Sequence, residues 1–138
     1  MTNDVITVAQ AIQHSVAPVF LITGVGAILG VLSTRLARVI DRFRILDELD
    51  DDKKYLHTTE MLTLIQRCQW IHWAITLCTT SALLICIVIA ALFIGSEINK
   101  DPSAIISFFF IAAMLTLTTG LVCFLREIAL SMGIIKLR

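Results

Sequence analysis

The sequence predicts an all-α integral membrane protein with three transmembrane helices and a cytoplasmic antiparallel helical hairpin that extends the first two. Residues 16–32, 74–94 and 105–125 form three apolar stretches without a charged side chain. Each is close to the roughly 17–25 residues that a helix needs to cross a bilayer. Hydrophobic residues make up 57% of the 138 residues, compared with roughly 45–50% in soluble domains.

The first element, residues 1–15, has an amphipathic pattern that predicts a segment lying on the outer membrane surface. It lacks the basic region and cleavage site of a secretory signal peptide, so we expect the apolar stretch that follows to stay in the mature protein. Pro18 either opens a new helix at residues 16–32 or kinks one continuous helix.

Span one, residues 16–32, is rich in glycine, and Gly24, Gly26 and Gly30 are candidate helix-packing positions. Gly26 and Gly30 form a GxxxG motif, which lets two helix backbones approach closely inside a membrane. The packing partner is either a helix of the same chain or a second subunit. Alternatively, these glycines mark a bend or line a narrow passage.

Residues 33–73 are predicted to form the hairpin. Apolar residues continue from span one in the three- and four-residue steps of a coiled-coil seam, namely Leu36, Val39, Ile40, Phe43, Leu46 and Leu49. We expect a turn at residues 50–54 and then a second helix that returns to the membrane, where Trp70 and Trp73 mark the interface. Basic and acidic residues balance in this segment, which argues against nucleic-acid binding.

The remaining elements complete the second and third crossings within a single membrane domain. We assign span two to residues 74–95, a short outer turn to residues 96–103 and span three to residues 104–126. Residues 127–138 are expected to run along the inner interface as a tail.

The distribution of basic residues predicts the orientation. Ten of the eleven Lys and Arg residues lie in residues 33–73 or at the C-terminal end, and only Lys100 lies in the outer turn. Because segments rich in Lys and Arg stay in the cytoplasm, we expect the hairpin and the C-terminus inside and the N-terminus outside. In a bacterial cell the host would be the inner membrane.

Arginines where span one leaves the membrane are one candidate functional group: Arg35, Arg38 and Arg42. They either pair with acids and reach lipid phosphates, or form a site for anionic lipids, or surround the cytoplasmic mouth of an oligomeric pore.

A polar stripe on span three is the second candidate group, and it runs through Thr116 and Thr119 to Glu127. The threonine hydroxyls either bond to nearby backbone or line an ion path with Glu127 as its charged gate. The neighbouring Arg126 points away from Glu127 on a helix, so we expect the partner of Glu127 on another helix, at Arg35 or Arg38.

No common catalytic motif occurs, so the sequence gives no indication of an enzyme. His57 with Glu60, and Cys68 with His72, each offer two metal ligands, fewer than the three or four that a zinc site needs. We therefore expect neither a metal nor a cofactor.

Several motifs together resemble a family of small bacterial membrane proteins known as domain of unknown function 2721. They are Ala17-Pro18, Gly24-Val-Gly26, the run Thr34-Arg-Leu-Ala-Arg38-Val-Ile-Asp-Arg42-Phe-Arg44, and Arg67-Cys-Gln-Trp-Ile-His-Trp73. The resemblance covers nearly the whole chain and implies a three-span bacterial membrane protein. It implies no activity and no catalytic residues.

Two functions fit these observations. The first is a homo-oligomer whose subunits together enclose an ion channel or pore, because three spans are too few to surround a solute path alone. The second is an accessory or scaffold protein that grips a protein partner through the hairpin. For both functions we expect the lipid bilayer, including anionic lipids, to be a binding partner.

Overall fold

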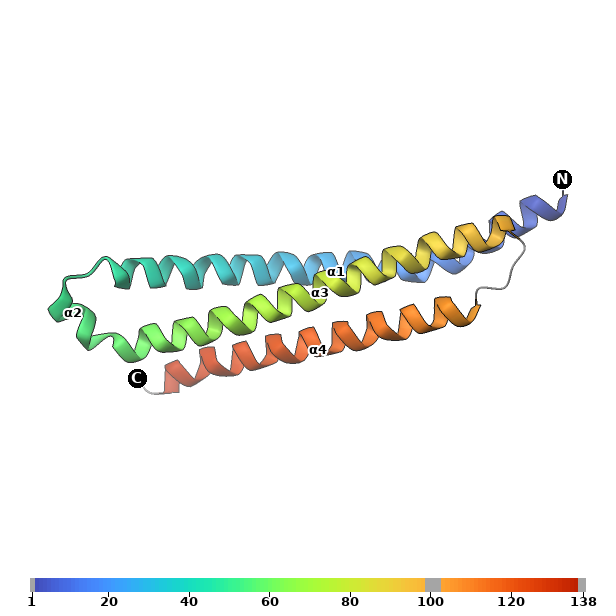
Figure 1. Ribbon diagram of the computed structural model, residues 1–138. Coiled ribbons are helices and arrows are strands. Elements are labelled where there is room, and N and C mark those ends of the chain that lie inside the picture. The colour runs from blue at the N-terminus through green and yellow to red at the C-terminus, as the bar shows by residue number, and fades with distance from the viewer. Residues whose placement is uncertain (1, 99–102, 137–138) are drawn as a thin grey trace.

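The computed structural model describes residues 2–98 and 103–136, which form four α-helices (Figure 1). They are α1 (Thr2–Asp47), α2 (Asp51–Leu56), α3 (Thr58–Ile98) and α4 (Ser103–Lys136). These described ranges contain no strand, so the predicted all-α class is confirmed. Residues 99–102 of the predicted outer turn, including Lys100, lie outside the described residues.

Helices α1, α3 and α4 are each long and apolar enough to cross a membrane. They contain 46, 41 and 34 residues, which correspond to roughly 69, 62 and 51 Å of helix at about 1.5 Å per residue. All three exceed the roughly 30 Å of a hydrocarbon core. The chain is therefore a multi-pass membrane protein whose helices extend beyond the apolar layer.

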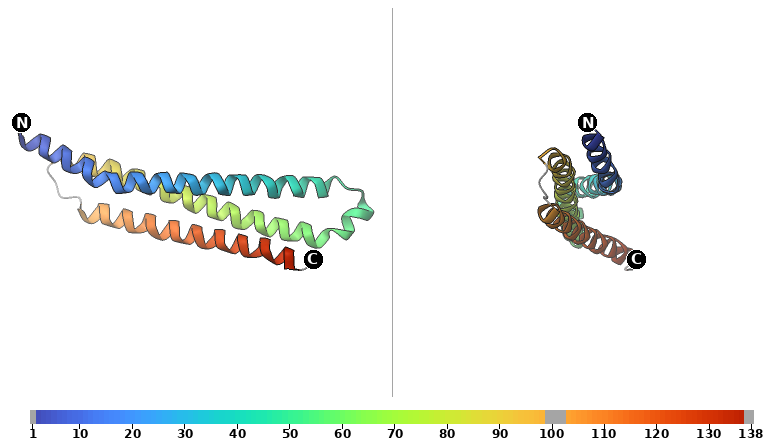
Figure 2. Two further views of the ribbon diagram at one scale, coloured as in Figure 1. Left: turned by 180° about the vertical axis from the view of Figure 1, so that it is seen from behind. Right: turned by 90° about the vertical axis from the view of Figure 1, so that its right-hand side faces the viewer.

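Helix α1 is continuous from Thr2 to Asp47, and Pro18 lies inside it and is buried. Of the two arrangements that the sequence allowed at Pro18, the structure has the single helix. A membrane helix tolerates an internal proline where neighbouring groups satisfy the freed backbone carbonyl. The N-terminal part of α1 is inclined to the rest of the helix (Figure 2).

Buried residues recur at seven-residue steps along the packed helices. In α1 they include Val25, Leu32, Val39 and Leu46, and in α3 one such series is Leu64, Ile71, Cys78 and Ile85. A seven-residue apolar repeat keeps two helices in contact if they coil around each other. Of the apolar residues predicted at the seam, Val39 and Leu46 are buried, Leu36, Phe43 and Leu49 are half-buried, and Ile40 is exposed.

Helix α3 lies between the other two long helices, and most contacts between helices join it to α1 or to α4 (Figures 1 and 2). Because α1 and α4 flank α3 instead of closing a bundle, each leaves a long face without a neighbour among the described helices. We call residues 33–73 the arm; they comprise the ends of α1 and α3 beyond the apolar stretches, with α2 between them.

A glycine brings α3 and α4 close together. A Cβ atom added at Gly120 would lie 3.1 Å from the Cys78 Sγ atom and 3.2 Å from the Leu77 Cβ atom, tighter than ordinary contact. Three residues after Cys78 on α3, the buried Ser81 hydroxyl donates a hydrogen bond of 2.9 Å to the Ala113 carbonyl of α4. Close backbone approach and interhelical hydrogen bonds replace the hydrophobic effect as the attraction between helices in lipid.

The connection between α1 and α3 corrects one sequence expectation. Residues 50–54, predicted as a turn, mostly belong to the short helix α2, whose first turn contains Asp51 and Asp52. Carboxylates there favour a helix because they face the positive end of its dipole. The Lys54 ammonium also forms a 2.6 Å ion pair with Asp47 at the end of α1.

The predicted C-terminal tail begins inside a helix. Helix α4 continues without a break from span three to Lys136, so residues 127–136 extend the third membrane helix in the same direction.

Candidate functional site

A buried carboxylate joins the three long helices. The side chain of Glu127 on α4 has no exposed surface. Its Oε2 atom accepts a hydrogen bond of 2.9 Å from Nη1 of Arg35 on α1. Its Oε1 atom accepts bonds from Nε and Nη2 of Arg67 on α3, at 3.0 and 2.8 Å. We call Glu127, Arg35 and Arg67 the ion clamp.

The repeat that builds the core also places the ion clamp. Ala113, Gly120 and Glu127 follow each other at seven-residue steps and are all buried, so Glu127 lies on the face of α4 that packs on α3. A buried charge is tolerated only if it is paired and hydrogen-bonded. The Arg35 guanidinium also lies 5.4 Å from the centre of the Phe124 ring, a favourable cation–π distance.

The ion clamp carries an excess of positive charge. Two guanidinium groups share one carboxylate, with Arg35 about a third exposed and Arg67 less so. No buried side-chain nitrogen or oxygen among the described residues lacks a hydrogen-bond partner. The arrangement is therefore a completed structural contact, with one net positive charge at the end of span three.

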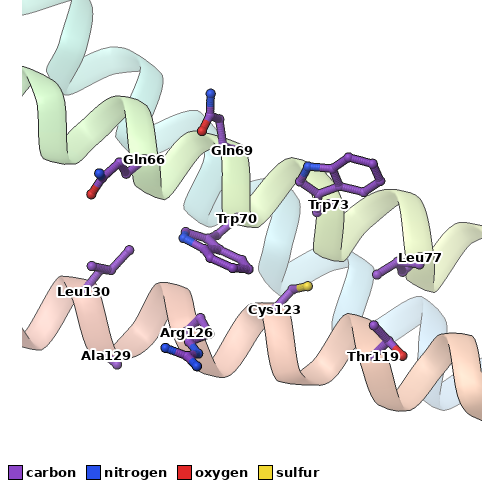
Figure 3. Close-up of a pocket in the computed structure, with 10 residues that line it drawn as sticks. All are labelled: Gln66, Gln69, Trp70, Trp73, Leu77, Thr119, Cys123, Arg126, Ala129 and Leu130. Atoms are coloured by element: carbon purple, nitrogen blue, oxygen red, sulfur yellow. The ribbon is translucent and has the colours of Figure 1, made fainter.

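A groove runs between α4 and α3, beside the face of α4 that carries Glu127 (Figure 3). It has a volume of about 910 Å³ and combines indole rings, amides, apolar side chains and one guanidinium group, contributed by Gln66, Gln69, Trp70, Trp73, Leu77, Thr119, Cys123, Arg126, Ala129 and Leu130. Because adjacent residues point to different sides of a helix, Arg126 faces this groove while Glu127 faces the core.

The structure separates the arginines that the sequence grouped together. Arg35 joins Glu127, one of the two pairings that the sequence suggested, whereas Arg38 is exposed on α1. Arg42 lies farther along the arm and forms a 2.9 Å ion pair with Glu60 of α3. The hydrogen bond from Arg42 is the main cause that lowers the pKa of Glu60 below its ordinary value, against a smaller opposing effect of burial.

The polar stripe of span three is divided between two surfaces. Thr116 is half-buried and donates to the Ala112 and Ala113 carbonyls of its own helix. Thr119 donates to the Leu115 carbonyl and lies at the groove. Both hydroxyls thus bond to nearby backbone, and Glu127 lies apart from them inside the ion clamp.

The three glycines of span one face open space. A Cβ atom at Gly24, Gly26 or Gly30 would meet no atom within 4 Å. The exposed Ser33 and Ala37 continue the row of Gly26 and Gly30 along α1. The close helix contact within the chain is made instead by Gly120.

The residues considered for metal binding do not form a complete site in the described ranges. The His57 Nδ1 atom lies 3.3 Å from Glu60 Oε2, and Glu60 is already paired with Arg42. Among residues 2–98 and 103–136, no group of three His, Cys, Asp or Glu side chains gathers around a common point.

The arm carries an apolar hollow of about 220 Å³ between α1 and α3. It is lined by Val39, Ile40, Phe43, Leu64, Ile65, Cys68 and Gln69. Tyr55 and Leu56 of α2 are also exposed, by 83% and 79%. Inside a membrane exposed apolar side chains meet lipid, but on a segment in water a contiguous patch of them indicates a contact surface.

Comparison with known proteins identifies the family. The family described as "Protein of unknown function (DUF2721)" matches residues 15–137. The chain belongs to this family. The match covers every element described above apart from the first part of α1, so the ion clamp, the groove and the glycine row all lie within the family region. No curated protein and no solved structure matches the chain.

The sequence did not indicate two of these features. Arg67 was not expected as a partner of Glu127, although it is the basic residue that precedes the aromatic pair of span two. The groove depends on how α3 and α4 are aligned, and Gln66 and Gln69 are far from Arg126 in the sequence. The two seven-residue steps from Ala113 through Gly120 to Glu127 were the available signal that Glu127 faces the core.

Proposed function

We propose that this chain is a subunit of a homo-oligomeric membrane protein in which several copies together enclose an ion path. The outward face of α1 carries the proposal, because Gly26, Gly30, Ser33 and Ala37 form an exposed row of small residues. Such a row permits close contact between membrane helices. Since none of the described helices occupies the space beside these glycines, a second copy is the simplest partner.

The proposed location is the bacterial inner membrane, with the N-terminus outside and the arm and C-terminus in the cytoplasm. The distribution of Lys and Arg supports this orientation. In this orientation the ion clamp and the groove lie near the cytoplasmic boundary.

The ion path would lie between subunits. A hollow of about 450 Å³ beside Gly30 is lined in part by Thr34, Arg35 and Arg38. In the described part of the chain, Arg38 forms no ion pair. If copies meet along the glycine row, Arg38 lies beside the contact between subunits, where its positive charge favours anions over cations. Glu127 has no place in this lining, because the ion clamp buries it.

Native mass spectrometry in mild detergent and ion flux in vesicles test the proposal together. Gly30→Leu should break the assembly and abolish flux, because the leucine side chain separates the two backbones. Ala90→Leu is the matched control, since Ala90 is exposed on α3 and lies away from the row. A monomeric wild-type protein, or an assembly without flux, would contradict the ion-path proposal.

A second candidate is an accessory protein that binds a protein partner through the arm. The apolar hollow lined by Ile40, Phe43 and Ile65 favours it, because this surface projects from the membrane in the proposed orientation. Ile65→Glu should release a stoichiometric partner while copy number in detergent stays unchanged. If no protein ever purifies with the wild-type chain in stoichiometric amount, the accessory function loses its support.

A further inference from the structure

We propose that the groove between α3 and α4 is a binding site for an anionic phospholipid of the cytoplasmic leaflet. The groove is a separate surface from the glycine row of α1, so the inference goes beyond the proposed assembly and does not depend on it; the assignment to the cytoplasmic leaflet rests on the proposed orientation. Its support comes from the polarity, charge and position of the lining residues.

The amides and the guanidinium group of the lining lie at its end toward the arm, beside Ala129 and Leu130, whereas Thr119 at the other end bonds its own backbone (Figure 3). Leu77 and Cys123 lie toward the middle of the membrane-spanning segments, whereas Gln66 and Arg126 lie toward the arm (Figure 3). Two contacts fix the alignment of α3 with α4. At the apolar end Gly120 closely approaches Leu77, and toward the arm Glu127 accepts a hydrogen bond from Arg67. An amphiphile that follows the groove would therefore have its chains over apolar side chains and its head group among amides and a guanidinium.

The charge of the groove selects an anionic head group. Its lining contains one cation, Arg126, and no Asp or Glu. Arg126 is exposed and makes no ion pair with the residues that the structure describes. The nearest carboxylate along the chain, that of Glu127, is occupied by Arg35 and Arg67. A basic pocket between membrane helices near the cytoplasmic side is a common setting for lipid phosphates.

Two tryptophans indicate the depth of the site. Trp70 and Trp73 both line the groove, and indole rings favour the level of the lipid head groups. Gln66, Gln69 and Trp70 also line the groove and carry N–H donors, which suit phosphate oxygens. A free phosphate ion would use only this polar end, whereas a phospholipid uses the whole groove.

Tryptophan fluorescence tests the proposal directly, because Trp70 and Trp73 are the two tryptophans of the chain. The protein is placed in phosphatidylcholine vesicles that contain a minor fraction of phosphatidylglycerol with brominated acyl chains, which quench nearby indoles. We expect quenching above the level for random mixing. The reciprocal vesicles, with brominated phosphatidylcholine as the minor lipid in phosphatidylglycerol, should show quenching below that level.

Arg126→Gln should weaken the preference for phosphatidylglycerol about fivefold, the effect of one arginine near an anionic lipid surface. Arg44→Gln is the matched control, because Arg44 is exposed on α1 and lies outside the groove; this variant should keep the wild-type preference. Circular dichroism verifies that both variants stay helical.

Three results would overturn the inference. Random-level quenching of the wild-type protein would show that no lipid is selected. If the Arg126 and Arg44 variants lost the preference for phosphatidylglycerol to the same extent, the preference would be a general effect of surface charge. Relief of quenching by soluble glycerol phosphate at the same concentration as the lipid would show that the site recognises a free phosphate and makes no use of the acyl chains.

Discussion

Replacing Glu127 by Gln removes the charge from the ion clamp while keeping nearly the same side-chain volume. Three hydrogen bonds converge on the wild-type carboxylate, two from Arg67 and one from Arg35. A glutamine has one acceptor oxygen, so its NH2 group must face one of the two guanidiniums, donor against donor. Removing one partner of a buried ion pair costs about 3–5 kcal/mol.

The exposure of the two arginines narrows this range. Arg35 is 36% exposed and can regain water, whereas Arg67 is 17% exposed and has less access to it. We therefore expect Glu127→Gln to lower the free energy of unfolding by about 3 kcal/mol, near the low end for a broken buried pair. For the same reason, Arg67→Gln should destabilise the chain more than Arg35→Gln.

Equilibrium unfolding in mixed detergent micelles, followed by circular dichroism, measures these differences. Arg44→Gln is the control for a lost surface charge and should change the free energy of unfolding by less than about 0.5 kcal/mol. If Glu127→Gln were as stable as this control, the ion clamp would not hold the three helices together. The reasoning from burial and pairing would then be refuted.

Three further perturbations test other contacts. Gly120→Leu should cost about 1–3 kcal/mol through overpacking, because a Cβ atom there already lies 3.1 Å from Cys78 Sγ; Gly26→Leu, in open space, should leave the unfolding free energy of the monomer unchanged. Ser81→Ala should cost about 1 kcal/mol in the same assay through loss of one interhelical hydrogen bond. Acidification should loosen the arm, because the pKa of Glu60 is lowered in the folded chain from its ordinary 4.5: the stabilisation is present above pH 4.5 and is lost as the pH falls through the folded-state pKa. Hydrogen exchange of the arm amides should show this pH dependence in the wild type, and much less of it in Arg42→Gln.

The fold could be predicted from the sequence because its main signals are local. The three apolar stretches each indicate a helix of sufficient length, and each lies inside one of the long helices. The steps from Leu36 to Leu49 likewise predicted a packed seam, and the structure buries Val39 and Leu46 there. Such patterns depend only on which residues share a face of one helix, and the sequence gives that directly.

The partners of individual side chains were harder to predict because they depend on the alignment between helices. The GxxxG motif shows that Gly26 and Gly30 permit close packing, but it does not indicate which helix packs against them. In this chain Gly120 makes the close contact and the motif faces open space. Arg67 was missed for the same reason, since its distance from Glu127 depends on the register between α3 and α4.

The adjacent residues Arg126 and Glu127 show how that register creates two different surfaces. Consecutive residues differ by about 100° around a helix, so they cannot both face α3. Gly120 fixes which side of α4 approaches α3, and Glu127, seven residues later, lies on the same side. Arg126 is then directed to the groove, and turning α4 to bury it would break the ion clamp without offering Arg126 an acid. The contact that stabilises the three helices is therefore also the one that keeps a cation at the mouth of the groove.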